Sequence, residues 1–462
     1  MASVMELGKV LAGAAKTLET LLTPASEGFV EFIRDKSVLI MGFGREGKST
    51  YNYIRKYLPE KDLTVCDQTT LTDETLVSDE HCTLVCGYDY MKVINDYDIV
   101  FKSPGISVRD VEIAPDTYVT CQLDMFMKYA PCVKVGITGT KGKTTTSTLT
   151  HCILKEAGVN TCLIGNIGVP VFELMDECEG MTAVIEMSSH QLEFTRTSPH
   201  IAILTNIYEE HLDHYNGFEG YYGAKLNIVR GQSEGDFFIH NAEQDISEFI
   251  NPDEIHSQQI TLGMPDEDTD TFLKSLVNIN PHLPGRHNAL DAFFAATAAK
   301  ILGVSENDIR AGLKTFEGIP HRLEHVGEFK GITFYNDCIA TVPTAVMLGV
   351  EALERVNTLI IGGMDRGLDY SEFVDELAES DIENIICLPE TGHNIGKALL
   401  GRCEKKIIKV DDMEGAVEAA YANTAQGKIC LISPAASSYN YYKNFEHKGE
   451  HYKELVRKFG GE

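Results

Sequence analysis

The sequence predicts an α/β protein of three domains, each built on a mostly parallel β-sheet covered by helices. Short apolar runs of strand length alternate with segments of helix length along the chain, the order that βαβ units require. Two strand-to-helix turns are rich in glycine, which is typical of sheets that bind nucleotides. We expect an N-terminal helical extension (1–35), a Rossmann-like domain (36–130), a central P-loop ATPase-type domain (131–319) and a Rossmann-like C-terminal domain (320–462).

The N-terminal segment has the apolar spacing of a helix. From Met5 to Ile33, apolar residues such as Leu7, Val10 and Leu21 recur at helical intervals with acidic residues interspersed. A secretion signal would not contain these acidic residues. We therefore expect a helix that packs on the first domain rather than one that contacts another chain.

The first domain begins with a nucleotide-binding fingerprint. The apolar strand Ser37–Met41 leads into a turn that contains Gly42, Gly44 and Gly47, then into a helix, and a second strand ends at Asp67. A strand, a Gly-x-Gly-x-x-Gly turn, a helix, a strand and an acid in this order favour nucleotide recognition over a purely structural turn.

A tight turn follows another expected strand of the first domain. The run from Asp96 ends in Ser103, Pro104 and Gly105. Loops at this end of the strands bind substrates in open α/β sheets, so we expect a substrate contact there.

The central domain opens with a phosphate-binding turn. An apolar strand leads into a loop in which Gly139 and Gly142 let backbone N–H groups approach a polyphosphate. The next helix adds its free N-terminal donors and the positive end of its dipole. Lys143 is placed to reach the β- and γ-phosphates, and Thr144 or Thr145 to bind Mg²⁺. ATP is therefore the first ligand hypothesis.

This loop departs from the usual P-loop pattern. A P-loop has a glycine five residues before Gly142, where this chain has Ile137. Gly136 and Gly139 stand on either side of that expected position. We interpret the loop as a P-loop variant, and the alternative is a glycine-rich turn with a solvated lysine.

Three polar residues follow the P-loop in the central domain. Glu186 ends an apolar strand, His211 follows another strand, and Lys225 lies in an expected helix. Glu186 and His211 suit a divalent cation that bridges phosphate and substrate. Each residue alone has a structural explanation: a capping carboxylate, a loop histidine and a solvated lysine. Their joint occurrence after one P-loop favours a site.

Further strand-like runs follow in the central and third domains. In the order of the chain, they are Ala183–Glu186, Ile201–Thr205, Phe237–His240, Ile332–Tyr335, Thr358–Ile361, Ile385–Leu388, Lys406–Val410 and Ile429–Ile432. A helix is expected from His287 to Leu302. These runs extend the α/β pattern to the end of the chain.

Composition excludes several classes of function. With 40 Lys and Arg against 69 Asp and Glu, the net charge of −29 argues against nonspecific nucleic-acid binding. No stretch approaches the roughly 20 apolar residues that span a membrane. The 12 cysteines lack metal-ligand spacing and, without a secretory signal, indicate a reducing cytoplasm. We expect a cytoplasmic monomer that acts on small molecules.

The ordered motifs resemble a known family, the Mur ligases of peptidoglycan precursor synthesis, and within it the glutamate-adding members. The matching motifs are Thr138–Thr144, Gly165–Gly168, Glu186–Glu193, Asn206–Asp213, Ala224–Leu226, His287–Leu290, Pro320–Glu324, Tyr335–Asp337, Gly362–Gly367, Ser433–Ser438 and Lys443–Glu446. The resemblance covers roughly residues 37 to 458 and implies a UDP-sugar domain, a central ATPase and a C-terminal glutamate domain.

The resemblance also implies a reaction. ATP would phosphorylate the alanyl carboxylate of UDP-N-acetylmuramoyl-L-alanine, and the amine of glutamate would then displace phosphate from the acyl phosphate. This order is chemically sensible because a carboxylate is a poor acyl donor and phosphate is a good leaving group. Positioned cations must offset the charge in both steps.

The resemblance assigns roles to individual residues. ATP contacts are implied for Gly139, Thr140, Lys141, Gly142, Lys143, Thr144, Thr145, Asn288, Arg322 and Asp337. Mg²⁺ contacts are implied for Thr144, Glu186, His211 and Lys225, and the lysine that matches Lys225 is carbamylated in relatives. Contacts to the UDP-sugar or glutamate are implied for Gly42, Gly44, Gly47, Asp67, Ser103, Pro104, Gly105, Asn166, Thr341, Arg366, Ser438 and Phe445.

One departure concerns the amino-acid substrate. D-glutamate-adding relatives read Ser-Lys-Ala-Thr where this chain has Cys338-Ile-Ala-Thr341, so Ile339 replaces a lysine beside the incoming glutamate. Arg366 still offers a bidentate fork for a carboxylate. We favour D-glutamate, and L-glutamate is the alternative.

Two rival interpretations belong to other classes of protein. The first glycine turn alone would fit an NAD-dependent oxidoreductase, which leaves the P-loop, Glu186 and His211 unexplained. A non-catalytic Mur-like partner that binds ATP is the second. The joint presence of Lys143, Glu186, His211 and Lys225 argues against that loss of activity.

Overall fold

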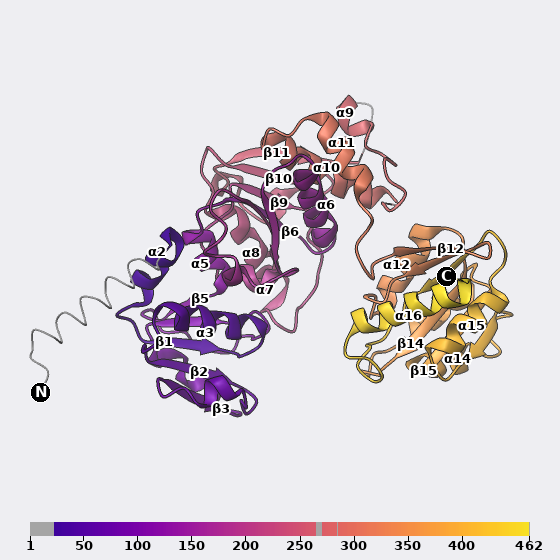
Figure 1. Ribbon diagram of the computed structural model, residues 1–462, viewed down its shortest axis with the longest axis horizontal. Helices are drawn as coiled ribbons and strands as arrows, with labels where there is room; N and C mark the ends of the chain where they lie inside the picture. The colour runs from indigo at the N-terminus through magenta and orange to yellow at the C-terminus, as the bar shows by residue number, and fades with distance from the viewer. Residues whose placement is uncertain (1–22, 265–269, 284, 462) are drawn as a thin grey trace, which may run out of the picture. The chain divides into compact units, whose positions relative to one another are not determined.

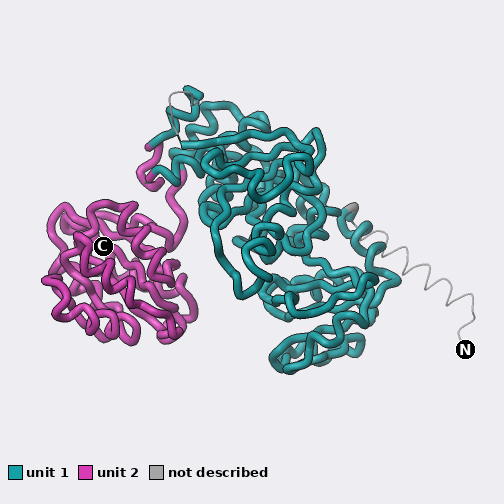
Figure 2. The backbone as a smooth tube through the Cα atoms, turned by 180° about the vertical axis from the view of Figure 1, so that it is seen from behind, with its two compact units in different colours: residues 1–277, 286–315 teal, residues 278–285, 316–462 magenta. Residues whose placement is uncertain are grey.

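The computed structural model describes residues 23–264, 270–283 and 285–461. They contain three β-sheets with helices on their faces, which confirms the predicted α/β class (Figure 1). The chain forms two compact units: unit 1 is residues 1–277 with 286–315, and unit 2 is residues 278–285 with 316–462 (Figure 2). Up to residue 22, the helix expected at the N-terminus lies outside the described residues.

The first sheet is parallel throughout, with strand order β3-β2-β1-β4-β5. Its strands are β1 (Val38–Met41), β2 (Leu63–Asp67), β3 (Cys82–Cys86), β4 (Ile99–Lys102) and β5 (Tyr118–Thr120), and its helices are α2 (Pro24–Ile33), α3 (Arg45–Tyr57), α4 (Glu74–Val77) and α5 (Gln122–Tyr129). Strand β1 is buried along its whole length, as expected for a strand covered on both faces. Because β1 lies between β2 and β4, the turn after it sits where the strand order reverses, which is the ligand crevice of such sheets.

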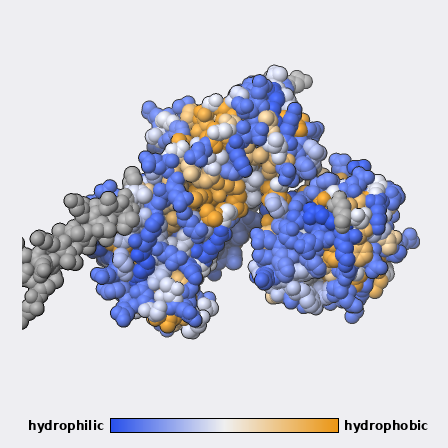
Figure 3. Space-filling view, viewed as in Figure 1, coloured by the Kyte–Doolittle hydropathy of each residue, from blue (hydrophilic) through white to orange (hydrophobic). Residues whose placement is uncertain are grey.

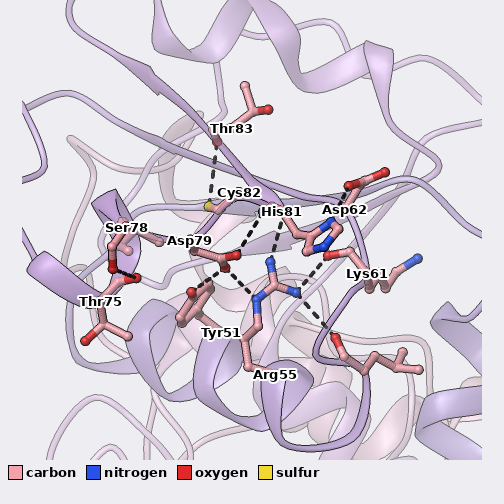
Figure 4. A network of polar contacts seen from close by, with 12 residues as sticks. Tyr51, Arg55, Lys61, Asp62, Thr75, Ser78, Asp79, His81, Cys82 and Thr83 are labelled. Atoms are coloured by element: carbon pink, nitrogen blue, oxygen red, sulfur yellow. Dashed lines mark hydrogen bonds and ion pairs between the residues drawn. The ribbon is translucent and has the colours of Figure 1, made fainter.

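A network of polar contacts holds helix α3 near strands β2 and β3 (Figure 4). Arg55 Nε donates to Asp79 Oδ2 at 2.6 Å, and the Tyr51 hydroxyl donates to the same oxygen at 2.5 Å. Arg55 also donates to the carbonyl oxygens of Lys61 and His81, at 2.7 and 3.0 Å. The network therefore fixes the helix that begins at the first glycine turn.

The second sheet is also parallel, with strand order β11-β10-β9-β6-β8-β7. Its strands are β6 (Val133–Thr138), β7 (Thr161–Gly165), β8 (Thr182–Glu186), β9 (Ile201–Leu204), β10 (Phe237–Asn241) and β11 (Gln258–Leu262), and its helices are α6 (Lys143–Glu156), α7 (Ser189–Leu192), α8 (Gly217–Arg230), α9 (Thr271–Lys274), α10 (Arg286–Ile301) and α11 (Glu306–Thr315). Strand β6 lies between β8 and β9, so the loops that follow these three strands meet at one edge. A Cβ on Gly312 would lie 2.6 Å from the Cα of Ile153, so glycine permits the close packing of α11 on α6.

The first two sheets share one hydrophobic core within unit 1. Phe29 of α2 packs edge-on against Phe172, with ring centroids 5.1 Å apart. Between α3 and the segment before β8, Asp176 accepts hydrogen bonds from the hydroxyls of Tyr53 and Tyr57, at 2.8 and 2.5 Å. These contacts join the first sheet to the second.

The third sheet lies in unit 2, with strand order β12-β13-β17-β14-β15-β16, and only β12 is antiparallel to its neighbour. Its strands are β12 (Glu324–Phe329), β13 (Ile332–Asn336), β14 (Val356–Gly363), β15 (Asn384–Glu390), β16 (Lys406–Lys409) and β17 (Ile429–Ile432). One core layer includes α12 (Pro343–Leu353), α13 (Ser371–Glu379) and α14 (Thr391–Leu399), and the other includes α15 (Met413–Asn423) and α16 (Phe445–Gly460). Helices thus cover both faces, as in doubly wound folds.

The surface is mainly polar in the view of Figure 3, and a hydrophobic area lies on unit 1 over the second sheet. Within the described part of the chain, we find no helix long and apolar enough to cross a membrane. All 12 cysteines are free, and Cys66, Cys121 and Cys430 are among the buried ones. The buried cysteines therefore serve as small core residues, whereas Cys86 is exposed.

Candidate active site

The glycines of the P-loop occupy positions that a side chain would disrupt. Gly139 has φ +151° and Gly142 has φ +84°, and only glycine adopts such conformations readily. A Cβ on Gly142 would lie 2.5 Å from Asp291 Oδ1 on helix α10, and a Cβ on Gly139 would collide with the hydroxyl of Thr205. Both glycines therefore let neighbouring elements approach the loop closely.

The segment after β9 fixes the shape of the P-loop. Thr140 N donates to the carbonyl oxygen of Asn206 at 2.9 Å, and Lys141 N donates to the side-chain oxygen of Asn206 at 2.8 Å. Thr205 Oγ1 donates to the carbonyl oxygen of Lys141 at 2.6 Å. The segment that makes these contacts continues to His211. The phosphate loop and the His211 loop are therefore held together by hydrogen bonds.

Lys143 and the following threonines lie at the start of α6. Lys143 Nζ donates to the carbonyl oxygens of Gly139 and Thr140, both at 2.9 Å, so its ammonium curls over the loop. Thr144 is partly exposed, whereas Thr145 is only 7% exposed. Of the two threonines left open by the sequence, Thr144 directly follows Lys143 and is the less buried.

Glu186 is a buried carboxylate with one unsatisfied oxygen. The residue ends strand β8 and is 1% exposed. Its Oε1 accepts from Asn166 Nδ2 at 2.7 Å, whereas its Oε2 has no hydrogen-bond partner among the described residues. An unpartnered buried carboxylate oxygen is unfavourable, and a hard divalent cation is a fitting partner for it. The Glu186 carboxylate therefore fits a ligand of Mg²⁺.

Lys225 projects from helix α8 into the underside of the P-loop. It is 1% exposed, and its Nζ donates to the carbonyl oxygen of Gly139 at 2.7 Å. Its ammonium also lies 4.6 Å from the ring centre of Tyr221. Burial, together with the nearby Lys143, holds the pKa of the Lys225 amine well below its ordinary value. A neutral amine is the form that can react with CO₂, so this environment favours a carbamate.

His211 lies on the loop after β9 with an unusual backbone. Its φ is +55°, a conformation that non-glycine residues adopt at a cost and often at functional sites. Its ring centre is 6.1 Å from that of Tyr221, which Lys225 also contacts. Burial lowers the pKa of His211, against the opposing effect of Glu210, and so favours the neutral imidazole that binds metals.

The protein side chains alone do not complete a metal site. Within the described ranges, no three His, Cys, Asp or Glu side chains converge as a set of metal ligands. Glu186 and His211 would therefore need further oxygen ligands from Thr144, phosphate or a modified Lys225. The predicted site residues do come together around the P-loop, with Glu186 on the strand next to β6 and Lys225 beneath Gly139.

The first glycine turn and the Ser103 loop form a second cluster. Ser103 Oγ donates to the carbonyl oxygen of Gly42 at 3.0 Å, and Asp67 Oδ2 accepts from Phe43 N at 3.0 Å. A Cβ on Gly42 would lie 2.7 Å from Ile106, whereas one on Gly44 would meet nothing within 4 Å. The backbone at Gly44 is therefore open to a ligand.

This second cluster lies in the same unit as the P-loop. The Arg45 guanidinium donates to the carbonyl oxygen of Gly168, near Asn166. Pro104 and Gly105 stand next to Ser103, with Gly105 exposed. The structure thus links the expected UDP-sugar turn to the Asn166 loop.

The remaining nucleotide residues divide between the two units. Asn288 lies in the first turn of α10, whose Asp291 accepts from Thr146 Oγ1 at 3.1 Å. In unit 2, Asp337 accepts from Ser433 Oγ at 2.7 Å and from Leu323 N at 3.2 Å. The second bond joins Asp337 to the segment that carries the exposed Arg322. Burial raises the pKa of Asp337 to about 6.

The expected glutamate residues surround two loops of unit 2 that are bonded together. Met364 N donates to the carbonyl oxygen of Ser437 at 2.8 Å, which joins the loop of the exposed Arg366 to that of Ser438. Ser438 is 2% exposed, and its hydroxyl has no partner among the described residues. Partly exposed Thr341 and Phe445 belong to the same unit.

Sequence reasoning missed a buried lysine beneath these loops. Lys448 is 2% exposed, and its Nζ donates to the carbonyl oxygen of Gly362 at 2.7 Å. Burial lowers its pKa to about 8. The sequence did offer a signal for Lys448. It lies three residues after the expected glutamate contact Phe445, and residues three apart share a helix face.

The fold and these loops define a P-loop nucleotide-binding protein of the α/β class. The family "Mur ligase middle domain" matches residues 137–299, and "Mur ligase, glutamate ligase domain" matches residues 321–436. The UDP-N-acetylmuramoylalanine--D-glutamate ligases of Acetivibrio thermocellus and Clostridium acetobutylicum are each 32% identical to this chain. The alignments cover 93% of this chain and 97% and 98% of those relatives. The chain belongs to the Mur ligase family.

Solved structures of the family share the fold. UDP-N-acetylmuramate-alanine ligase from Thermotoga maritima matches with a TM-score of 0.56 and 18% identity, over 92% of this chain and all of that one. MurF ligase from the same organism, in complex with ADP, matches with a TM-score of 0.55 and 16% identity, over 91% and 95%. At this identity the likeness concerns the fold.

Proposed function

We propose that this protein is an ATP-dependent ligase that joins D-glutamate to UDP-N-acetylmuramoyl-L-alanine in peptidoglycan precursor synthesis. The observation that carries the proposal is the convergence on one P-loop of Lys143, the unsatisfied Glu186 oxygen and the buried Lys225. The names of relatives aligned over 93% of the chain support the substrates. We also propose that it works as a cytoplasmic monomer. Its proposed parts are the N-terminal extension (1–35), the UDP-sugar domain (36–130), the ATP-binding domain (131–319) and the glutamate domain (320–462).

The first chemical step transfers the γ-phosphoryl group of ATP to the alanyl carboxylate. The backbone N–H groups of the P-loop and the start of α6 would hold the phosphates, and Lys143 would neutralise charge on the group in transfer. Thr144, Glu186, His211 and a carbamylated Lys225 would hold Mg²⁺, which supplies further charge neutralisation when bound. ADP leaves, and the substrate becomes an acyl phosphate.

The second step forms the amide bond. The uncharged amine of glutamate attacks the acyl carbon, the bond from carbon to the phosphate oxygen breaks, and phosphate and a proton are released. In unit 2, Arg366 would hold a carboxylate of glutamate through paired hydrogen bonds, and Ser438 would offer its unpartnered hydroxyl. The Gly42 turn, Asp67 and the Ser103 loop would hold the UDP end of the acceptor.

The proposal of D-glutamate rather than L-glutamate rests on the overall similarity of the chain to its relatives. Ile339 is partly buried, and its N–H donates to the carbonyl oxygen of His321 at 3.2 Å. A side chain there without charge leaves the cationic role to Arg366. The relatives named for D-glutamate favour the D form.

A single assay tests the reaction and its stereochemistry. Purified protein is mixed with ATP, Mg²⁺, UDP-N-acetylmuramoyl-L-alanine and either D- or L-glutamate, and phosphate release is measured with product mass. D-glutamate-dependent phosphate release supports the proposal, and release with L-glutamate alone corrects the stereochemistry. Nicotinamide absorbance changes without ATP turnover would indicate an oxidoreductase, and ATP binding without turnover a non-catalytic partner.

A further inference from the structure

Glu193 is a carboxylate on which two parts of the candidate site converge. Lys102 Nζ lies 3.1 Å from Glu193 Oε2, and His214 Nε2 lies 3.2 Å from the same oxygen. Lys102 ends strand β4 directly before Ser103, and His214 belongs to the loop of His211. One oxygen therefore connects the expected substrate loop of the first sheet to the expected metal loop of the second.

Lys102 and His214 are buried, and Glu193 is partly buried. The side chains of Lys102, His214 and Glu193 are 1%, 8% and 17% exposed. Burial acts to raise the pKa of Glu193, but contacts with His214 and Lys102 hold that pKa below its ordinary value. A buried cation without its counter-ion is strongly unfavourable, so Lys102 and Glu193 keep each other in place.

Backbone contacts strengthen the same connection. Ser107 Oγ donates to the carbonyl oxygen of His214 at 2.6 Å, and the Arg109 guanidinium donates to that of Asp213. His214 N in turn donates to the carbonyl oxygen of His211 at 3.0 Å. The turn that presents His211 is thus held from the segment that follows the Ser103 loop.

The same carboxylate residue also contacts the helix of Lys225. Asn227 Nδ2 on α8 donates to the carbonyl oxygens of Leu192 and Glu193, at 2.9 and 3.3 Å. Asn227 lies two residues from Lys225 in the sequence. Movement of Glu193 would therefore displace Asn227 and the helix that carries Lys225.

We propose that Lys102, Glu193 and His214 are positioning residues that couple binding of the UDP-sugar to binding of the Mg²⁺-nucleotide. A ligand that orders the Ser103 loop fixes Lys102, and Glu193 and His214 then hold the His211 loop in one arrangement. Because coupling between two sites is reciprocal, each substrate binds more tightly when the other is bound. This inference rests on the proposed function.

The test measures coupling directly by calorimetry. UDP-N-acetylmuramoyl-L-alanine is titrated into the protein with and without Mg²⁺ and a non-hydrolysable ATP analogue. We expect the analogue to tighten UDP-sugar binding by at least about 5-fold in the wild type. The ratio of the Kd for the UDP-sugar without the analogue to the Kd with it measures the coupling. In Lys102→Met and in Glu193→Gln, this ratio should fall close to one, while each ligand alone still binds. Lys102→Arg should restore it.

Two further variants separate positioning from simple loss of structure. Lys56→Met removes a 2.7 Å pair with Asp176 that also joins the first sheet to the second, and it should leave the ratio unchanged. If a single variant does not fold, the double variant Lys102→Met with Glu193→Gln removes both charges of the pair. Glu193 and His214 line a cavity of about 290 Å³, which gives this double variant room to adjust.

The outcomes distinguish this inference from the proposed function. An active wild type without coupling would overturn the inference, as would folded Lys102→Met with wild-type coupling or an equal loss in Lys56→Met. A wild type that binds neither substrate and releases no phosphate would instead contradict the proposed function.

Discussion

The ammonium nitrogens of Lys143 and Lys225 both donate to the carbonyl oxygen of Gly139, at 2.9 and 2.7 Å. Two like charges on one carbonyl repel each other, and Lys225 is the deeply buried one. Burial first, and repulsion by Lys143 second, hold the pKa of the Lys225 amine well below its ordinary value. Conversion of its amine to a carbamate would replace repulsion with attraction and add an anionic ligand for Mg²⁺.

Replacement of Lys225 by alanine should therefore abolish activity in a way that small acids repair. Loss of one electrostatic element of such a site lowers kcat on the order of 100- to 1,000-fold. We expect Lys225→Ala to show this loss and to recover activity with added short-chain carboxylic acids. Native mass spectrometry of the wild type should show the added mass of one CO₂. Lys155→Ala, at an exposed position of α6, serves as the control, and absence of both rescue and added mass would contradict the carbamate.

Replacement of Glu186 by glutamine should separate activity from stability. The unsatisfied Oε2 means that the carboxylate contributes little to folding, since an unmet buried group costs about 1–3 kcal/mol. We expect Glu186→Gln to unfold at an equal or higher temperature while kcat falls at least about 100-fold and the Mg²⁺ requirement rises.

Asp124→Asn provides the matched comparison for Glu186→Gln. Asp124 is also 1% exposed, but it accepts from Thr120 Oγ1 at 3.0 Å and from Arg196 N at 2.7 Å. Its loss should lower stability without a change in the Mg²⁺ requirement. A marked loss of stability in Glu186→Gln would show that its carboxylate is satisfied in the absence of metal.

Local sequence patterns were sufficient for the phosphate loop and for the strands that carry the site. The expected strand through Glu186 is β8 (Thr182–Glu186), and the glycines of the P-loop have the backbone angles that the motif requires. Such features depend on neighbours in the chain, so the sequence reports them directly. The pairing of Lys102 with Glu193 joins residues far apart in the chain, and no local pattern encodes it.

Edge strands and the buried lysines were harder to foresee. Strand β11 (Gln258–Leu262) is mostly exposed, and therefore lacks the apolar run that identified the central strands. The sequence left a solvated lysine as the alternative for Lys225 and gave no prediction for Lys448. Both lysines are buried and donate to carbonyl oxygens. Burial of a charge depends on three-dimensional packing, and the resemblance implied a role at the site for Lys225 but not for Lys448.

Asp337→Asn should stabilise unit 2 in a pH-dependent way. Burial raises the pKa of Asp337 to about 6 from 3.8, so between these values the folded state binds more protons and stability falls as pH rises. Asparagine removes this effect. We expect a gain of up to about 3 kcal/mol at pH 8 that shrinks at pH 5, measured by urea unfolding of the full-length protein. Asp365→Asn, at an exposed position, should show no such trend. An equal gain in stability of Asp337→Asn at both pH values would show that the raised pKa is not its cause.

Arg366→Met should weaken glutamate binding selectively. Arg366 is exposed, so its loss should leave stability within about 0.5 kcal/mol. A charge-assisted bidentate contact contributes about 1.5–3 kcal/mol, which corresponds to a rise of about 10- to 100-fold in the KM for glutamate. The KM for ATP should stay constant. Arg402→Met, which removes an exposed 2.8 Å pair with Asp375, is the control, and equal effects of both variants would sink the assignment.

Two glycines that flank α6 allow the effect of backbone strain to be separated from the effect of close packing at the P-loop. Gly142 and Gly158 flank the helix with φ of +84° and +74°, so alanine is strained at both, by about 1–2 kcal/mol. A Cβ on Gly142 would also meet Asp291 Oδ1 at 2.5 Å, whereas one on Gly158 would meet nothing within 4 Å. We therefore expect Gly142→Ala to lose at least about 1 kcal/mol more stability in urea unfolding. Calorimetry should show loss of Mg²⁺-ATP binding in Gly142→Ala alone; equal behaviour of the two variants would mean that close approach of α10 does not shape the nucleotide site.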